Sequence, residues 1–364
     1  MSKASPRRIL RSAKDLIAAG LIDASRLNEA AAVAERYAVA VPPALQALID
    51  PADRDDPIAR QFLPDARELD LSPDEVADPI GDHLKSPVKG LVHRYPDRVL
   101  IKPVAACAVY CRFCFRREQV GPGREAMSEA DWQAALAYIR ARAEIWEAIL
   151  TGGDPLILSP RRIAEIGKRL AEIPHLRVLR WHTRLPVAAP ERVTPALSRA
   201  LTFSHDRSVY VAVHANHPRE LTAEARGALA RLRRAGVLLV SQTVLLKGVN
   251  DDVATLEALM RGLVEAGVKP YYLHHLDRAP GTAHFRVPLD RGRALVSSLR
   301  QRLSGLAMPT YMLDLPGAQG KVVAEAAAVR RVGEGLYAAR DRDGVEHLYR
   351  DEPPAAPLAA DNLG

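Results

Sequence analysis

The stretch Cys107-Ala-Val-Tyr-Cys111-Arg-Phe-Cys114-Phe-Arg-Arg117 contains all three cysteines of the chain, in the spacing C-x3-C-x2-C. This spacing brings three thiolates around one tight loop, where they can hold a metal centre from one side. Ordinary electron-carrying iron–sulfur clusters use four cysteine ligands, and structural zinc sites also close with four ligands. Three cysteines without a fourth therefore predict a four-iron–four-sulfur (4Fe-4S) cluster on Cys107, Cys111 and Cys114, with one iron left open.

An open iron is what a radical S-adenosylmethionine (SAM) enzyme needs, because the methionine end of the nucleotide chelates it. Two alternatives stay open at this point. The pair Cys111-x-x-Cys114 alone is typical of a thioredoxin-like redox site, and a distant histidine could complete a zinc site. The third cysteine fits the redox pair poorly, and the grouping of all three in one loop favours the iron–sulfur cluster.

The composition is that of an ordinary globular protein, with 48% hydrophobic and 26% charged residues. A chain of 364 residues can form one large α/β barrel or two domains. Three cysteines so close together are too few for a disulfide framework, so we expect a reducing cytoplasm. The N-terminus leads into an amphipathic segment and not into a signal sequence. No run approaches the roughly 18 apolar residues of a membrane span, so we expect no membrane partner.

The net charge of +7 raises the question of a nucleic-acid partner. The arginines are scattered along the chain, and aromatic residues make up only 5% of it. Few aromatic side chains leave little surface on which single-stranded bases could stack. We therefore do not expect nucleic acid as the main partner, and some of the positive charge can serve anionic cofactors.

The sequence pattern changes near residue 98. Before it, helical spacing at 13–20 and 27–37 and a Pro- and Asp-rich portion predict short helices and turns that cover a neighbouring unit. After it, strands and helices alternate. The predicted strands are 99–104, 148–151, 178–182, 208–213, 237–243 and 269–275. The predicted helices are 128–142 with Ser128 as N-cap, 160–171, one after Pro190, 223–235, 253–266 and 290–306.

This alternation predicts a parallel α/β sheet with right-handed crossovers. Polar residues at the ends of successive strands favour a barrel over an open sheet. They are Cys107, Gly152-Gly153-Asp154, Thr183-Arg184, His214, Gln242 and His274. A dinucleotide-binding sheet would need G-x-G-x-x-G after the first strand, where the cysteines stand instead. We predict a partial (β/α)6 barrel with its site on the C-terminal rim.

With the cysteine loop in this setting, the chain resembles the lysine 2,3-aminomutase family of radical SAM enzymes. The resemblance extends in one order over roughly residues 37–325. Besides the cysteines it rests on the segments Tyr37-Ala-Val-Ala-Val-Pro-Pro, His93-Arg-Tyr-Pro-Asp-Arg98, Gly152-Gly-Asp-Pro155, Thr183-Arg-Leu-Pro186, His214-Ala-Asn-His-Pro218, Gln242-Thr-Val-Leu-Leu-Lys-Gly-Val-Asn250, His284-Phe-Arg286 and Asp314-Leu-Pro-Gly-Ala-Gln-Gly-Lys321.

The resemblance implies an isomerase of the intramolecular aminotransferase type, which converts L-lysine to β-lysine with SAM and pyridoxal 5′-phosphate (PLP). The reduced cluster would cleave SAM to a 5′-deoxyadenosyl radical, which would take hydrogen from C3 of lysine held on PLP. The amino nitrogen would then migrate from C2 to C3. The protein would position the substrate and exclude water, while the cofactors supply the chemistry.

The resemblance also implies a SAM site. The turn Gly152-Gly153-Asp154 resembles the turn that binds the methionine amino group, and its glycines permit close approach of the backbone to a ligand. His214, Asn216 and Gln242 are further candidates to line this SAM cavity. For each of these three, a buried polar side chain that only satisfies backbone groups is the alternative.

Lys321 resembles the lysine that the family presents to PLP as a Schiff base. The glycine-rich run before it is not a P-loop, because Val322 stands where Ser or Thr would hold magnesium. Arg94 and Arg98, with Tyr95 nearby, can offer donors to the PLP phosphate. The alternative for the two arginines is a charge pair on a helix face.

Three residues are candidates for substrate binding. Arg116 resembles the arginine that binds the substrate α-carboxylate, a task that suits the guanidinium geometry. Asp277 and Asp314 resemble the two carboxylates that hold the distant ammonium of lysine. Two buried carboxylates that face one site repel each other unless a cation lies between them. A lysine side chain supplies this cation, so the pair favours lysine over glutamate, although either residue taken alone could be a capping or solvated Asp.

The expected organisation is an N-terminal cover (1–92), the radical SAM barrel (93–308), a C-terminal segment that carries the PLP lysine (309–350) and a disordered tail (351–364). Long family members carry further cysteines near the C-terminus for zinc. This chain has none there, so we expect no zinc. We expect a homo-oligomer and an electron donor such as a flavodoxin or a ferredoxin.

Three other functions stay open. The segments Cys-Arg-Phe-Cys-Phe-Arg-Arg and His-Leu-Asp-Arg resemble those of the family branch that makes (R)-β-lysine for the modification of elongation factor P. A radical SAM enzyme that modifies RNA would suit the isoelectric point near 9.4. An iron–sulfur protein that senses or binds without catalysis would not cleave SAM.

Overall fold

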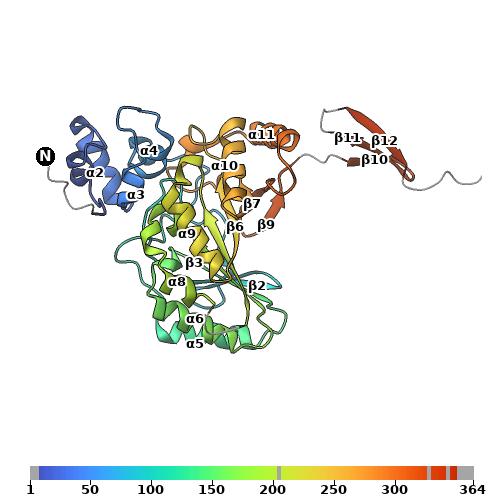
Figure 1. Ribbon diagram of the computed structural model, residues 1–364, viewed down its shortest axis with the longest axis horizontal. Coiled ribbons are helices and arrows are strands. Elements are labelled where there is room, and N and C mark those ends of the chain that lie inside the picture. The colour runs from blue at the N-terminus through green and yellow to red at the C-terminus, as the bar shows by residue number, and fades with distance from the viewer. Residues whose placement is uncertain (1–7, 203–205, 326–328, 342–344, 351–364) are drawn as a thin grey trace, which may run out of the picture.

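The computed structural model describes residues 8–202, 206–325, 329–341 and 345–350 (Figure 1). Its centre is a nine-stranded sheet whose strands stand in sequence order. They are β1 (Leu91–Tyr95), β2 (Arg98–Val104), β3 (Glu147–Gly152), β4 (Val178–Thr183), β5 (Ser208–His214), β6 (Leu238–Val244), β7 (Lys269–His274), β8 (Thr310–Leu315) and β9 (Gly320–Val323). Strands β2 to β8 are parallel, and β1 and β9 are the antiparallel edge strands.

The sheet curves until its two edges meet. Lys321 of β9 donates its backbone N–H to the Tyr95 hydroxyl of β1 at 2.7 Å, and Arg94 of β1 donates to Asp314 of β8 at 3.0 Å. The result is a nearly closed barrel of mainly parallel strands. The predicted fold class is confirmed, because the six predicted strands correspond to β2 through β7.

Strands β1, β8 and β9 were not predicted from the sequence. They are short, and β8 adds one more parallel strand next to β7. Three residues of these strands that line the cavity described below are charged: Arg94, Asp314 and Lys321. Charged inward positions remove the apolar alternation by which a half-buried strand is recognised.

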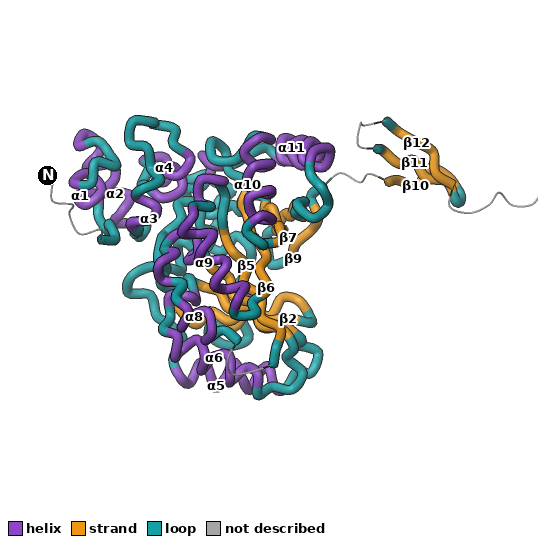
Figure 2. The backbone as a smooth tube through the Cα atoms, viewed as in Figure 1, coloured by secondary structure: helices purple, strands orange, loops and turns teal. Residues whose placement is uncertain are grey.

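Helices cover the outside of the barrel (Figure 2). They are α5 (Glu129–Arg140), α6 (Pro160–Ala171), α7 (Leu185–Ala188), α8 (Pro195–Ala200), α9 (Ala223–Arg234), α10 (Val253–Glu265) and α11 (Leu289–Arg302). The predicted N-cap is confirmed, since Ser128 Oγ accepts from the backbone N–H of Asp131 and the Asp131 carboxylate accepts from that of Ser128. Helix α5 buries Trp132, Ala135, Leu136 and Ile139, the spacing of one helix face.

The N-terminal part contains α1 (Ala13–Ala18), α2 (Leu27–Arg36), α3 (Pro43–Gln46) and α4 (Pro57–Phe62). Short 3-10 helices join the larger elements: η1 (Ala24–Arg26), η2 (Ala66–Leu69), η3 (His83–Lys85), η4 (Pro155–Ile157), η5 (Pro190–Arg192), η6 (Pro218–Glu220) and η7 (Ala283–Phe285). Leu16, Leu45 and Phe62 form one apolar cluster with Val109 of the cysteine loop. The N-terminal helices therefore pack directly on the loop that carries the cysteines.

A buried cluster of charged side chains also stabilises the contact between the N-terminal part and the cysteine loop. Glu68 of η2 is fully buried and accepts from Arg112 Nε at 2.9 Å and Arg112 Nη2 at 2.6 Å, as well as from Arg117. The Arg117 guanidinium also lies 3.5 Å from the ring centre of Tyr37. Burial alone would raise the pKa of Glu68, but the two guanidinium groups hold that pKa below its usual value.

A second sheet lies beyond β9 and stands apart from the barrel in Figure 1. It consists of β10 (Val329–Gly333), β11 (Leu336–Arg340) and β12 (Glu346–Arg350), all antiparallel. Ala338 is the one buried residue in these three strands. The tail predicted at 351–364 lies outside the described residues.

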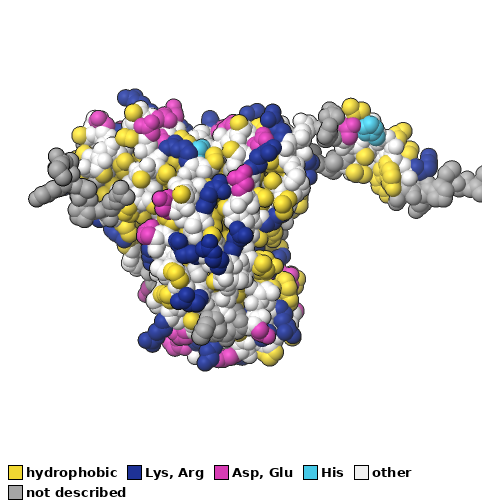
Figure 3. Space-filling view, viewed as in Figure 1, with side chains coloured by type: hydrophobic (Ala, Val, Ile, Leu, Met, Phe, Trp, Pro, Cys, Tyr) yellow, Lys and Arg dark blue, Asp and Glu magenta, His cyan; other side chains and the backbone are white. Residues whose placement is uncertain are grey.

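Basic side chains are spread over the surface among acidic and apolar ones, with a group over α9 (Figure 3). The last turn of α9 holds Arg231, Arg233 and Arg234. Cations at this end of a helix are stabilised by the helix dipole. This group of arginines therefore has a structural explanation.

We predict that Glu68→Gln destabilises the protein by about 3–5 kcal/mol, because it leaves two buried guanidinium groups without their carboxylate. The free energy of unfolding in urea at neutral pH measures this loss. The difference from wild type should shrink at low pH, as the wild-type carboxylate is protonated through its lowered pKa. Glu129→Gln, which removes an exposed partner of Arg169, is the control and should change little. Equal stability of the two variants would contradict the prediction.

Candidate active site

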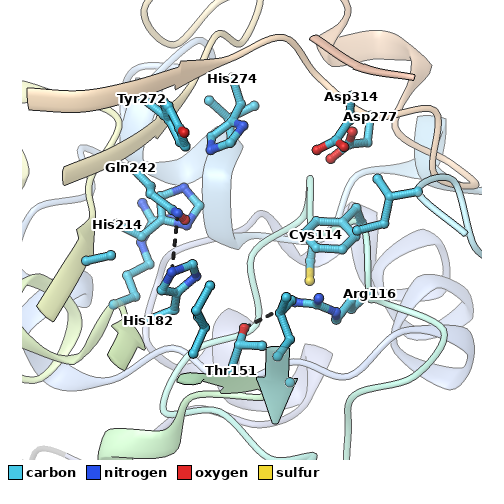
Figure 4. A pocket seen from close by; sticks show the side chains of 18 of the residues that line it. Cys114, Arg116, Thr151, His182, His214, Gln242, Tyr272, His274, Asp277 and Asp314 are labelled. Carbon is cyan, nitrogen blue, oxygen red and sulfur yellow. Dashed lines mark hydrogen bonds between the residues drawn. The ribbon is translucent and has the colours of Figure 1, made fainter. Parts of the chain in front are cut away.

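The ends of the parallel strands surround a cavity of about 340 Å³ (Figure 4). All the polar residues predicted to gather at the rim line it: Cys107, Gly152, Gly153, Asp154, Thr183, Arg184, His214, Gln242 and His274. The edge strands and the loop after β7 add Arg94, Tyr95, Arg98, Asp277, Asp314 and Lys321. Residues separated by more than two hundred positions in the chain thus meet in one chamber.

The three cysteines lie together on the wall of this cavity as free thiols. Burial raises the pKa of all three, and Cys111 raises that of Cys114 further, to about 11. Burial thus favours the neutral thiols, and a bound cation would favour the thiolates. Among the described residues no three His, Cys, Asp or Glu side chains could hold a single metal ion. The three thiols on one loop are the donor set that a cluster held at three corners would use.

The turn after β3 lies against the cysteine loop. A Cβ on Gly153 would stand 2.2 Å from the carbonyl oxygen of Ala106, and Gly152 has φ +97°. The backbone N–H of Gly153 donates to Val104 O at 2.7 Å, and that of Asp154 to Ala106 O at 3.0 Å. The two glycines are thus required by the close approach of two chain segments, in addition to any ligand.

The Asp154 carboxylate is used inside the protein. It accepts from Thr183 Oγ1 at 2.7 Å and from the backbone N–H of Arg184 at 2.8 Å. Burial raises the pKa of Asp154, although these hydrogen bonds oppose that effect. Asp154 therefore ties the end of β4 to the end of β3 while it lines the cavity.

His214 and Gln242 face the cavity, and Asn216 does not. His214 Nε2 is buried without a hydrogen-bond partner in the part of the chain that the structure describes, and burial lowers the pKa of His214 to about 3. Asn216 is fully buried; its Oδ1 accepts from Val244 N–H at 2.9 Å and its Nδ2 donates to Gln61 at 3.1 Å. The structure thus keeps Asn216 away from the cavity and favours the alternative that it satisfies buried polar groups.

The hairpin β8–β9 brings Lys321 into the cavity opposite Asp314. Lys321 Nζ contacts the Asp314 carboxylate. Burial lowers the pKa of Lys321 to about 8, although the negative charge of Asp277 opposes the shift. Lys321 is therefore an amine that loses its proton far more readily than a surface lysine.

Arg94, Tyr95 and Arg98 belong to the hairpin β1–β2, so the helix-face alternative for the two arginines is wrong. Pro96 and Asp97 form the turn that connects these two antiparallel strands, so the segment that carries the arginines is not helical. The Arg98 guanidinium lies 4.5 Å from the centre of the Tyr95 ring. All three side chains line the cavity. They lie close to Lys321, which donates its backbone N–H to the Tyr95 hydroxyl.

Arg116 is held by Asp82, a residue that the sequence analysis did not single out. Its Nε and Nη2 donate to Asp82 Oδ2 at 3.0 and 2.9 Å, and its Nη1 donates to Thr151 at 3.2 Å. Asp82 is fully buried and also lies 3.9 Å from Arg94 and from Lys102. No local pattern marks Asp82, because its three cationic neighbours come from distant segments.

Asp277 lines the same cavity, and its carboxylate makes no hydrogen bond or ion pair with any described residue. Burial raises its pKa to about 6, although Lys321 and Arg116 lower it. The sequence analysis also did not assign Arg180, His182 and Tyr272, which line the cavity. Alternation along β4 and β7 could have identified them, since Arg180 and His182 lie four and two positions before Arg184, and Tyr272 lies two positions before His274.

Comparison with known proteins gives a consistent result. The radical SAM superfamily model matches residues 101–259. The chain is 40% identical over 283 residues to L-lysine 2,3-aminomutase of Clostridium subterminale, which covers 78% of this chain and 68% of the relative. It is 38% identical over 285 residues to L-lysine 2,3-aminomutase of Escherichia coli (strain K12), covering 78% and 82%. Glutamate 2,3-aminomutase of Clostridioides difficile (strain 630) is 36% identical over 321 residues, covering 88% and 75%.

The described part of the chain contains no helix long and apolar enough to cross a membrane.

We predict that the Lys321 amine titrates near pH 8 and that Asp277→Asn moves this titration to lower pH, because the Asp277 charge stabilises the ammonium form. Competitive acetylation at a series of pH values, followed by peptide mass spectrometry, measures the midpoint. Lys89 is the internal control, since it is exposed and Glu125 raises its pKa. Its profile should be the same in both proteins. A Lys321 midpoint that does not move in the variant would contradict the cavity electrostatics.

Proposed function

The chain belongs to the lysine 2,3-aminomutase family of radical SAM enzymes, and from this premise we propose that it converts L-lysine to β-lysine. The reaction moves the amino group from C2 to C3, so the enzyme is an isomerase. The family implies a 4Fe-4S cluster and SAM. The dependence on PLP and the choice of lysine are our proposals.

The observation that carries the choice of lysine is the pair of carboxylates Asp277 and Asp314. Both lie around one amine, since Asp314 contacts Lys321 Nζ and Asp277 shifts its pKa. Asp277 has no partner among the described residues and its pKa is raised by burial, so a further cation beside it would be stabilised. The side-chain ammonium of lysine is such a cation. The side-chain carboxylate of glutamate would be repelled there.

The cofactors have candidate ligands among the residues that line the cavity. The cluster would be held by Cys107, Cys111 and Cys114, and SAM would lie along Gly152, Gly153, Asp154, His214 and Gln242. PLP would be held by Lys321, with its phosphate on Arg94, Tyr95 and Arg98. When bound, the reduced cluster and SAM supply a carbon-centred radical that removes hydrogen from an unactivated carbon, and PLP supplies a π-system that delocalises an unpaired electron beside the migrating nitrogen.

The chain's own residues would position the substrate. The Arg116 guanidinium, fixed by Asp82 and Thr151, would bind the α-carboxylate of lysine, while Asp277 and Asp314 bind the ammonium at the other end. Holding both ends of a flexible substrate places C2 and C3 at one position in the cavity and lowers the entropic cost of reaction. Lys321, whose pKa is lowered to about 8, has a larger fraction of neutral amine near neutral pH than an exposed lysine, and this form can react with an aldehyde.

The walls of the cavity would protect reactive species from water. The N-terminal helices cover the cysteine loop, and Phe113, Leu276 and Phe285 form an apolar cluster beside it. Excluding water strengthens the ionic contacts in the cavity and prevents side reactions. The external electron donor, the homo-oligomer, the cytoplasmic location and a role in elongation factor P modification stay predictions.

The proposal is tested by anaerobic reconstitution with iron, sulfide, SAM and PLP, followed by incubation with a reductant and either L-lysine or L-glutamate. We expect β-lysine from lysine and no β-glutamate, measured by chromatography and mass spectrometry. Borohydride treatment of the resting enzyme should fix PLP covalently on Lys321, in a peptide identified by mass. Lys321→Ala should lose both signals, whereas Lys89→Ala, an exposed control, should keep them. Absence of β-lysine from an enzyme that holds iron and PLP would refute the proposed reaction.

We predict that Asp277→Asn raises the KM for lysine at least tenfold and changes kcat less. A lost contact between a carboxylate and an ammonium costs about 1.5–3 kcal/mol, which is a factor of ten or more in affinity. Steady-state kinetics of β-lysine formation measure both constants. Asp290→Asn, an exposed carboxylate at the start of α11 outside the cavity, is the control. An unchanged KM in Asp277→Asn would show that this carboxylate does not bind the substrate ammonium.

A further inference from the structure

Arg184, the residue after β4, contacts a cysteine of the loop that follows β2. It is 5% exposed and places its Nη1 3.2 Å from Cys111 Sγ. No other side chain in the described part of the chain donates a hydrogen bond to a cysteine sulfur. The guanidinium also lies 4.6 Å from the ring centre of Phe62 and 5.5 Å from that of Phe113.

A set of buried partners fixes the position of this guanidinium. Its Nη2 donates to Glu220 Oε2 at 2.7 Å and to Gln61 Oε1 at 2.6 Å. Glu220 and Gln61 are both fully buried, and Gln61 Nε2 donates to Glu220 Oε1 at 3.3 Å. Since the pair Arg184–Glu220 is enclosed by protein, its charges are screened little by water.

We propose that Arg184 sets the reduction potential of the iron–sulfur cluster through its hydrogen bond to the sulfur of Cys111, with Glu220 as the opposing charge. The proposal rests on the cluster that the family implies, and it does not depend on lysine being the substrate. Hydrogen bonds to the ligand sulfurs and the nearby net charge are the terms by which a protein tunes such a potential.

The direction of the effect follows from charge. Reduction adds one electron from an external low-potential donor, breaks no bond and places more negative charge on the cluster and its sulfurs. A cationic donor at Cys111 stabilises this reduced form more than the oxidised form, so Arg184 raises the potential. The Glu220 carboxylate, bonded to the same guanidinium, acts in the opposite direction.

Gln61 connects the contact between Arg184 and Cys111 to the N-terminal helices. It belongs to α4, and its Oε1 accepts from both Arg184 and Asn216, at 2.6 and 3.1 Å. Its backbone carbonyl accepts from the N–H of Arg112, the residue after Cys111. Gln61 is thus a positioning residue that holds the Arg184 guanidinium and the cysteine loop at fixed positions relative to each other.

The experiment is a redox titration of the reconstituted enzyme without substrate, followed by electron paramagnetic resonance of the reduced cluster. We expect Arg184→Gln to lower the ratio of reduced to oxidised cluster at a given potential about tenfold, which corresponds to a midpoint about 59 mV more negative for one electron. We expect Glu220→Gln to move the midpoint in the positive direction. Gln61→Leu should follow Arg184→Gln with a smaller shift. Arg161→Gln, an exposed position on α6, is the control.

Shifts of opposite sign in Arg184→Gln and Glu220→Gln support the proposal, because a residue needed only for folding would not reverse sign with charge. If Arg184→Gln fails to hold iron, the positive shift in Glu220→Gln and the negative shift in Gln61→Leu still decide it. Midpoints equal to wild type in the iron-loaded variants overturn the proposal. Unchanged midpoints together with weaker SAM binding in Arg184→Gln would assign this guanidinium to the nucleotide instead and would overturn it as well.

Discussion

Three buried thiols that would have to become thiolates to bind metal are the constraint on which much of this structure depends. Burial raises the pKa of Cys107, Cys111 and Cys114, so a loop that is to bind metal through thiolates needs positive charge around it. Arg184 supplies it directly at Cys111, and Arg112 stands next to the same cysteine in the chain. A buried guanidinium is itself costly without a carboxylate. The protein therefore surrounds the loop with buried arginines, each paired with an acid from another segment.

The partners of these arginines give the N-terminal part a role beyond covering the barrel. Glu68 binds Arg112, Gln61 binds Arg184, and Asp82 binds Arg116. All three come from the first ninety residues and all three are fully buried. They hold the cysteine loop and the proposed carboxylate-binding arginine at fixed positions. Preorganisation of this kind lowers the cost of arranging charged groups when a ligand binds.

Acidic and basic side chains are also paired at the end of the cavity that contains Lys321. Asp314 contacts Lys321 and Arg94, and Asp277 remains without a partner among the described residues. Burial lowers the pKa of Lys321 and raises that of Asp277, so both pKa values lie closer to neutral pH than those of exposed groups. One end of the chamber thus suits an anionic metal–thiolate centre, and the other suits a molecule with an ammonium group.

The sequence by itself determined the features that depend on neighbours in the chain. The spacing of the cysteines, the capping box at Ser128 and the six strands β2–β7 are local patterns, and polar residues at strand ends meet because parallel strands end at one edge. Only the tertiary structure decided what lies across space. It removed Asn216 from the cavity, showed that Gly153 is required by the Ala106 carbonyl, and paired Arg184 with Cys111. Such contacts join residues that no sequence spacing relates, so their energies act only once the chain is folded.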